Sequence, residues 1–202
     1  MKIKYLNSNL MKSTKCLLAA LFCLTLVTSC DNDDDTPAPV LEEEIITNVT
    51  LTFVNDANAS DVVVMSNVAP DGQDGASTSQ VTGAFTTGAT YSLSLSLVNA
   101  EDPNAPEDVL NEDIIQEADE HFFAYAVSGI NLTMTRDAND VAGPDGSKLG
   151  VNTTWVAGTA STGDVQIRLI HEPTTVDDSN EFGSVSGGSE DINITFEDVE
   201  IQ

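Results

Sequence analysis

The cysteine at position 30 constrains this chain most, because it separates an export signal from an acidic protein that contains no further cysteine. The segment 1–15 carries four lysines and no acid, and an apolar run of 12 residues follows at positions 16–27. A membrane-spanning helix needs about 20 apolar residues, so this shorter run indicates the core of a signal peptide. Residues 1–29 are therefore predicted to be removed on export.

The residues around the cysteine indicate how the exported protein is held. Val27-Thr28-Ser29-Cys30 resembles the lipobox of bacterial lipoproteins, in which an aliphatic residue and two small residues precede the cysteine. The resemblance implies that Cys30 becomes the lipid-modified N-terminus. Such an anchor is firm, because each buried CH₂ contributes roughly 0.8 kcal/mol to membrane binding. The alternative is a plain signal peptide cut nearby, which would leave Cys30 unmodified.

Acidic residues occupy four of the five positions after the cysteine. This run resembles the export tag that directs lipoproteins of Bacteroidota to the outer membrane, often to its outer surface. It also fits a solvated tether, since like charges repel and keep a chain extended. We expect residues 30–43 to form the lipidated cysteine and acidic tether, and residues 44–202 to form a single domain.

Charge limits the partners of the mature chain. Removal of the signal leaves three basic residues against 33 acidic ones, a formal balance of −30. A chain of this charge repels phosphate, so nucleic acid and anionic lipid head groups are disfavoured as partners. No disulfide is expected, since Cys16 and Cys23 lie in the signal and Cys30 takes the lipid. The fold must therefore depend on its core alone.

From about residue 45 the chain alternates between apolar and polar residues with the period of two that is typical of half-buried strands. The clearest example is the segment 91–97, in which Tyr91 and three leucines alternate with serines. The pattern predicts nine short strands separated by Gly, Asp and Asn turns. They are expected at 45–53, 62–65, 80–85, 91–97, 122–127, 131–136, 151–157, 165–171 and 192–201.

About nine short strands predict an all-β fold, an antiparallel β-sandwich with immunoglobulin-like topology. A small β-barrel is the alternative. The cysteine–tryptophan–cysteine signature of antibody domains is absent, and Trp155 is the single tryptophan. The strand pattern breaks in the acidic segment 101–120, where Leu110 and Ile114 lie four residues apart and indicate a short helix.

Two histidines remain after the signal, and their placement is the most specific chemical signal in the sequence. His121 opens one predicted strand and His171 closes another. If these strands are antiparallel neighbours, both imidazoles lie at one rim of the sheet. Together with Asp119, Glu120 and Glu172 they offer nitrogen and oxygen ligands that suit zinc or another divalent transition metal. The alternative is that each histidine is an ordinary strand-end residue, since carboxylates lie near any histidine in so acidic a chain.

Acidic loops are a second candidate site, for calcium, which takes six to eight oxygen ligands. The acids in question are Asp71, Asp74, Asp137, Asp140, Asp145, Asp177, Asp178, Glu181, Glu190 and Asp191. None of these groups has the spacing of a defined calcium loop, so solvated turn acids are the simpler interpretation. Catalysis is not expected, because the segment 183–187 has valine where the serine of a nucleophile elbow would stand.

Three features together point to a family: the lipobox with its acid run, the segment 42–47, and the histidine segments 117–121 and 168–173. They resemble small acidic lipoproteins of Bacteroidota, some of which are linked to TonB-dependent receptors. In that family an arginine directly precedes the second histidine, whereas Ile170 stands there in this chain. The resemblance implies a lipid-anchored protein of the outer membrane or cell surface.

The sequence thus predicts an outer-membrane lipoprotein with a noncatalytic ligand- or metal-binding role, accessory to a TonB-dependent uptake receptor. The alternative is a calcium-stabilised structural or adhesin-like surface domain. The two differ in the ion they would bind, a transition metal at the histidines or calcium at the acidic loops.

Overall fold

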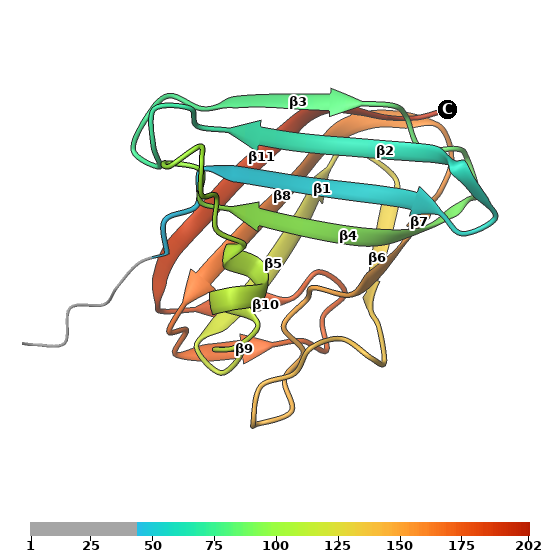
Figure 1. Cartoon of the computed structure of the whole chain (residues 1–202). Coiled ribbons are helices and arrows are strands. Elements are labelled where there is room, and N and C mark those ends of the chain that lie inside the picture. The colour runs from blue at the N-terminus through green and yellow to red at the C-terminus, as the bar shows by residue number, and fades with distance from the viewer. Residues whose placement is uncertain (1–43) are drawn as a thin grey trace, which may run out of the picture. The chain divides into compact units, whose positions relative to one another are not determined.

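The computed structural model describes residues 44–202, so the predicted signal peptide, Cys30 and the tether lie outside the described residues. The described part is built almost entirely of antiparallel strands, arranged in two main sheets and one small hairpin (Figure 1). The predicted all-β sandwich is confirmed. The two sheets remain separate and their strands cross at an angle (Figure 1).

The first sheet has six strands in the order β3-β2-β1-β4-β7-β6, and the second has three in the order β11-β8-β5. The strands of the first sheet are β1 (Asn48–Asn55), β2 (Asn58–Val68), β3 (Thr78–Thr82), β4 (Thr90–Val98), β6 (Leu132–Arg136) and β7 (Thr153–Ala157). Those of the second sheet are β5 (His121–Ser128), β8 (Ser161–His171) and β11 (Ser189–Ile201). A separate hairpin pairs β9 (Thr175–Asp177) with β10 (Ser184–Ser186).

All nine predicted strands are present, and the hairpin of β9 and β10 is what the sequence pattern missed. Each of its strands has three residues, too few to show a period of two. The sheets hold six and three strands, whereas a constant-type immunoglobulin domain holds four and three. The likeness to that fold therefore extends to the sandwich architecture and not to the strand order.

The core lies between the two sheets, where alternate residues of each strand point inward. Trp155 of β7 is fully buried. Its ring lies edge-to-face with Phe53 of β1 at 5.4 Å and with Tyr125 of β5 at 5.6 Å. Such aromatic pairs contribute about 0.5–1.5 kcal/mol each beyond the area they bury. Residues 44–202 contain no cysteine, so within the described part aromatic packing across the interface helps to hold the two sheets together.

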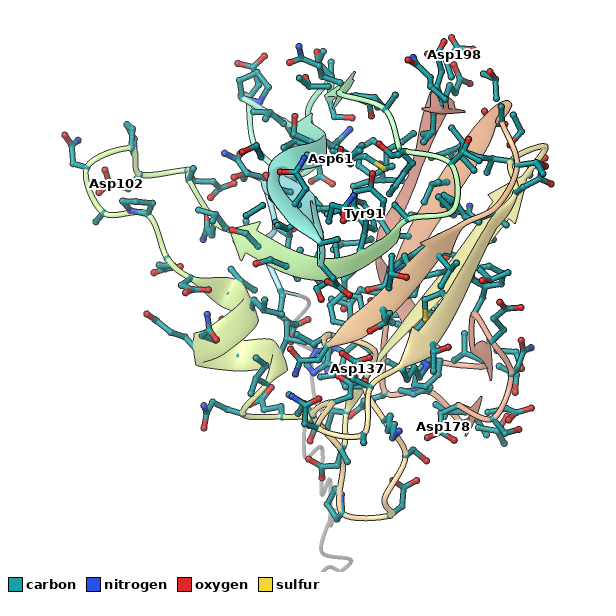
Figure 2. All side chains as sticks on the ribbon, turned by 90° about the vertical axis from the view of Figure 1, so that its right-hand side faces the viewer. Asp61, Tyr91, Asp102, Asp137, Asp178 and Asp198 are labelled. Atoms are coloured by element: carbon teal, nitrogen blue, oxygen red, sulfur yellow. The ribbon has the colours of Figure 1, made fainter. Side chains whose placement is uncertain are left out.

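The acids are accommodated mainly at the periphery of the domain. Asp102, Asp137, Asp178 and Asp198 lie on loops or at a strand kink toward its outside (Figure 2). Asp61 turns inward and has a partner, because its carboxylate accepts a hydrogen bond of 2.8 Å from the Tyr91 hydroxyl (Figure 2). The charge is therefore spread over solvated positions, which keeps its self-repulsion low.

The short helix expected within 101–120 is present as η1 (Leu110–Ile114), a single π-helical turn. The Ile115 amide donates to the Leu110 carbonyl at 3.0 Å, which is the five-residue spacing of this helix type. The Leu110 and Ile114 side chains are buried, so the apolar spacing is explained by packing onto the core. The chain then runs through 115–120 directly into β5.

Arg136, at the end of β6, is buried beside β5, an edge strand of the three-stranded sheet. The Arg136 guanidinium donates to the carbonyls of Phe123 at 2.6 Å and Lys148 at 3.1 Å, and it lies 4.5 Å from the centre of the Phe122 ring. Gly150 approaches it with φ of +97°, and a Cβ there would collide with the guanidinium. Arg136 therefore ties the acidic loop 137–150 to β5.

We predict that Arg136→Leu lowers the free energy of unfolding by roughly 3 kcal/mol or more, because buried carbonyls lose hydrogen bonds from a charged donor. Arg168→Leu is the matched control, since Arg168 makes an exposed ion pair of 2.6 Å with Glu190. Its loss should cost about 1 kcal/mol or less. Urea unfolding of both variants measures this, and equal losses would contradict the clamping role of Arg136.

Candidate metal centre

The two histidines face each other across neighbouring strands. β5 pairs with β8 in antiparallel register, and His121 is directly opposite His171. The imidazole rings are stacked, with centroids 4.8 Å apart and planes inclined by 17°. The two strands are thus antiparallel neighbours, which is the condition that the candidate site required, and the two rings lie at one end of the three-stranded sheet.

Strand alternation turns both rings toward the interior of the sandwich. His121 shares a sheet face with Phe123 and Tyr125, and His171 shares it with Leu169 and Ile167, since residues two apart point the same way. These four neighbours belong to the buried core. The histidine side chains are 0% and 6% exposed. The two imidazoles therefore lie at the end of the buried core and not at the solvent-exposed edge of the sheet.

A third polar group reaches the same place through a β-bulge in β11. The register of β11 against β8 passes from Glu190 opposite Ile170 to Ile192 opposite Leu169. Asp191 is thus an extra residue without a cross-strand partner, and bulges of this kind re-aim side chains. Its carboxylate gathers with the two imidazoles, and both of its oxygens are buried.

The fourth group comes from the chain that leads into β1 of the other sheet. Glu44 places Oε1 at 2.9 Å from His121 Nε2 and Oε2 at 3.6 Å from His171 Nδ1. Its side chain is 9% exposed. We call Glu44, His121, His171 and Asp191 the inner cluster; their ligand atoms all lie within 4.8 Å of one another.

The inner cluster has the donor set and the size of a zinc-type site. Two imidazole nitrogens and two carboxylate oxygens suit zinc and related divalent transition metals. A tetrahedral ion with bonds of about 2.0 Å places its ligand atoms roughly 3.3 Å apart. The two contacts of Glu44 with the histidines, at 2.9 and 3.6 Å, lie on either side of that spacing.

The hydrogen bond on the far side of His121 determines which nitrogen faces inward. Nδ1 lies 3.0 Å from the Glu117 carbonyl oxygen, which only accepts, so Nδ1 carries a proton. In a neutral ring Nε2 then has a bare lone pair, yet it lies 2.9 Å from the Glu44 carboxylate. Two acceptors at that distance need a proton or another cation between them.

His171 is held in the same manner. Its Nε2 lies 3.5 Å from the Glu120 carboxylate, which is on the solvent side and 46% exposed. With a proton on Nε2, Nδ1 directs its lone pair at Glu44 and the inner cluster. Each histidine therefore offers one nitrogen inward while an outer acceptor holds the other, which is the arrangement typical of metal-bound histidines.

Buried polar atoms of the cluster lack hydrogen-bond partners. Within the described residues these are Glu44 Oε2, His171 Nδ1 and both carboxylate oxygens of Asp191. An unpaired buried polar group costs free energy, and a buried charge costs more. Among residues 44–202 the ion pairs of Glu44 are with the two histidines, and neither Lys148 nor an arginine reaches it.

The pKa shifts describe what happens when protons alone neutralise the cluster. Burial, and then the Glu44 charge, raise the pKa of Asp191 to about 7. Burial by itself would lower the pKa of His121, but the hydrogen bonds to Glu44 and the Glu117 carbonyl, together with the nearby carboxylate charges, outweigh it and the pKa is raised. Burial acts to raise the pKa of Glu44, but the hydrogen bond and the charge of His121, with smaller contributions, lower it overall. The inner cluster thus attracts positive charge.

The residues that the sequence singled out fall into three places. His121 and His171 belong to the inner cluster, while Glu120 and Glu172 form a second, more exposed group with His171. Asp119 belongs to neither group and lines a pocket of about 560 Å³ that borders His121. The ligand candidates missed at the histidines are Glu44 and Asp191.

Two of the acids considered for calcium accept hydrogen bonds within their own loops. The Asp140 carboxylate accepts from the amides of Gly150, Val151 and Asn152 at 2.7–3.0 Å, and Asp145 accepts from Ser147. Asp191 is the only one of these candidates that joins a group of three or more potential ligands within residues 44–202. Asp140 and Asp145 therefore act as turn and loop caps.

Comparisons of this chain with known proteins found no match. No model of a protein family matches the chain, and neither the curated proteins nor the solved structures gave a match. Among the residues described, no helix has the length and apolar character needed to span a membrane. Function is therefore argued from the inner cluster itself.

Proposed function

We propose that this protein is an outer-membrane lipoprotein whose sandwich binds one divalent transition-metal ion of the zinc type at the inner cluster. The ligands are His121 Nε2, His171 Nδ1 and one carboxylate oxygen each from Glu44 and Asp191. The observation that carries the proposal is the buried convergence of two nitrogens and two carboxylates, several of whose atoms lack a protein partner.

Charge supports a divalent ion in particular. Two carboxylates and two neutral imidazoles carry a charge of −2, so a dication makes the buried cluster neutral. Burial of net charge is costly, and a neutral complex avoids that cost. A monovalent cation would leave one negative charge, and it would gain little from imidazole nitrogens.

The burial of the site favours a noncatalytic role. Catalytic zinc sites keep an open coordination position for water or substrate, whereas structural sites use four protein ligands. The inner cluster supplies four protein ligands, and the side chains of Glu44, His121 and His171 are each less than a tenth exposed. The ion would therefore stabilise the fold or be retained, and it would not activate a water molecule.

The proposed location rests on residues 1–43, through the lipobox and the acid run. An accessory role beside a TonB-dependent uptake receptor remains part of the proposal, on the family resemblance alone. Metabolic labelling of cells with a palmitate analogue tests the anchor. We expect label on the wild-type protein and none on Cys30→Ala, and equal labelling of the two would contradict lipidation at this cysteine.

We predict that calorimetry on residues 31–202 shows one zinc ion bound per chain. His121→Ala, His171→Ala and Asp191→Asn should each weaken binding by about 100-fold or more, and Glu120→Gln, which loses an outer partner of His171, by about tenfold. Asp119→Asn is the control and should bind as the wild type does. Absence of stoichiometric binding, or wild-type affinity in both histidine variants, would contradict the metal centre.

Zinc should stabilise the protein more at high pH than at low pH. Between its usual value of 3.8 and about 7, folded Asp191 keeps a proton that the unfolded chain releases, so the ion-free protein loses stability as the pH rises. The raised pKa of His121 acts in the same direction above its usual 6.5. Zinc needs these groups deprotonated, so its effect grows with pH.

Melting temperatures with and without zinc, measured at about pH 5.5 and about pH 8, check this. The increase caused by zinc should be the larger at pH 8, and the Asp119→Asn variant should follow the wild type. A zinc-induced increase that is the same at both pH values would show that the ion binds without displacing protons from the inner cluster.

A further inference from the structure

We infer that the bound ion fastens the entry segment, residues 44–46, onto the three-stranded sheet, so that occupancy of the site determines how firmly the start of the domain is held. This inference rests on the proposed metal binding. It assigns regulation to that same site, because the ligand Glu44 lies in the segment that leads into β1 of the other sheet.

The four ligands come from two different parts of the fold. His121, His171 and Asp191 lie on β5, β8 and β11, which are adjacent strands of one sheet. Backbone pairing fixes these three relative to one another. Glu44 is the exception, because it precedes β1 of the six-stranded sheet (Figure 1). An ion that binds all four therefore links the two sheets.

The main chain holds the entry segment only from Ile46 onward. Within the described residues, the Ile46 amide donates to Gln73 Oε1 at 2.9 Å, and the Thr47 amide donates to the Val98 carbonyl at 3.0 Å. Ile46 is buried, whereas Ile45 is 43% exposed. Glu44 is thus attached to the body of the domain through its carboxylate.

Without a metal ion, that attachment consists of two contacts with the histidines. One carboxylate oxygen lies within hydrogen-bond distance of His121, and the other lies 3.6 Å from His171. A divalent ion replaces these contacts with a direct bond and pulls the carboxylate toward the strands. Because the predicted tether ends at residue 43, an ion bound to Glu44 would fix the position at which the tether joins the domain.

Ile45→Cys provides a reporter, because residues 31–202 contain no cysteine and this position is exposed. A nitroxide attached there is read by electron paramagnetic resonance, without zinc and at saturating zinc. The same label at Val156→Cys, an exposed position on β7, is the control. Glu44→Gln is combined with each label, and calorimetry on the same samples reports whether zinc is bound.

We expect zinc to broaden the spectrum of the label at position 45, as its motion becomes restricted, and to leave the label at position 156 unchanged. Glu44→Gln should abolish the broadening while the three remaining ligands still bind zinc with lower affinity. Bound zinc without broadening, or broadening that persists in Glu44→Gln, would overturn the fastening and leave the metal site intact. Absence of zinc binding would overturn both.

Discussion

The contact between the Glu44 carboxylate and His121 Nε2, at 2.9 Å, is the interaction on which this end of the sandwich depends. It brings a charged group from the start of one sheet to the inner face of the other. The features around it serve the same contact: the Glu117 carbonyl fixes the ring of His121, and the bulge in β11 adds Asp191. Without a proton or a metal ion between them, the lone pairs of the buried carboxylates and imidazoles would face one another, which is costly in a buried space.

The sequence located the two histidines at strand ends, but it left open whether those strands are neighbours, and it did not give the partners of the pair. Alternation located β5 and β8 and placed His121 and His171 at their ends, and antiparallel pairing then brings such ends together. Glu44 could not be found in this way, because it lies before a strand of the other sheet and meets His121 across 77 positions of sequence. Asp191 depends on a bulge, and a pattern of period two gives no sign of where one residue is inserted.

The scarcity of basic residues gives the inner cluster its character. Of the three basic residues within 44–202, Arg136 donates to backbone carbonyls, Arg168 pairs with the exposed Glu190, and Lys148 donates to the Arg136 carbonyl. A lysine or arginine beside Glu44 and Asp191 would have made an ordinary buried ion pair. In its place stand two imidazoles, which take protons or metal according to the surroundings.

The ligand Asp191 is present because β11 contains one more residue than its pairing with β8 needs. Pairing on either side of it is regular, with Glu190 opposite Ile170 and Ile192 opposite Leu169. Deletion of that one residue would let the ladder close through both pairs and leave the rest of β11 in place. The ligand could therefore be gained or lost by insertion or deletion of one codon, as well as by substitution, while the pairs on either side of it are kept.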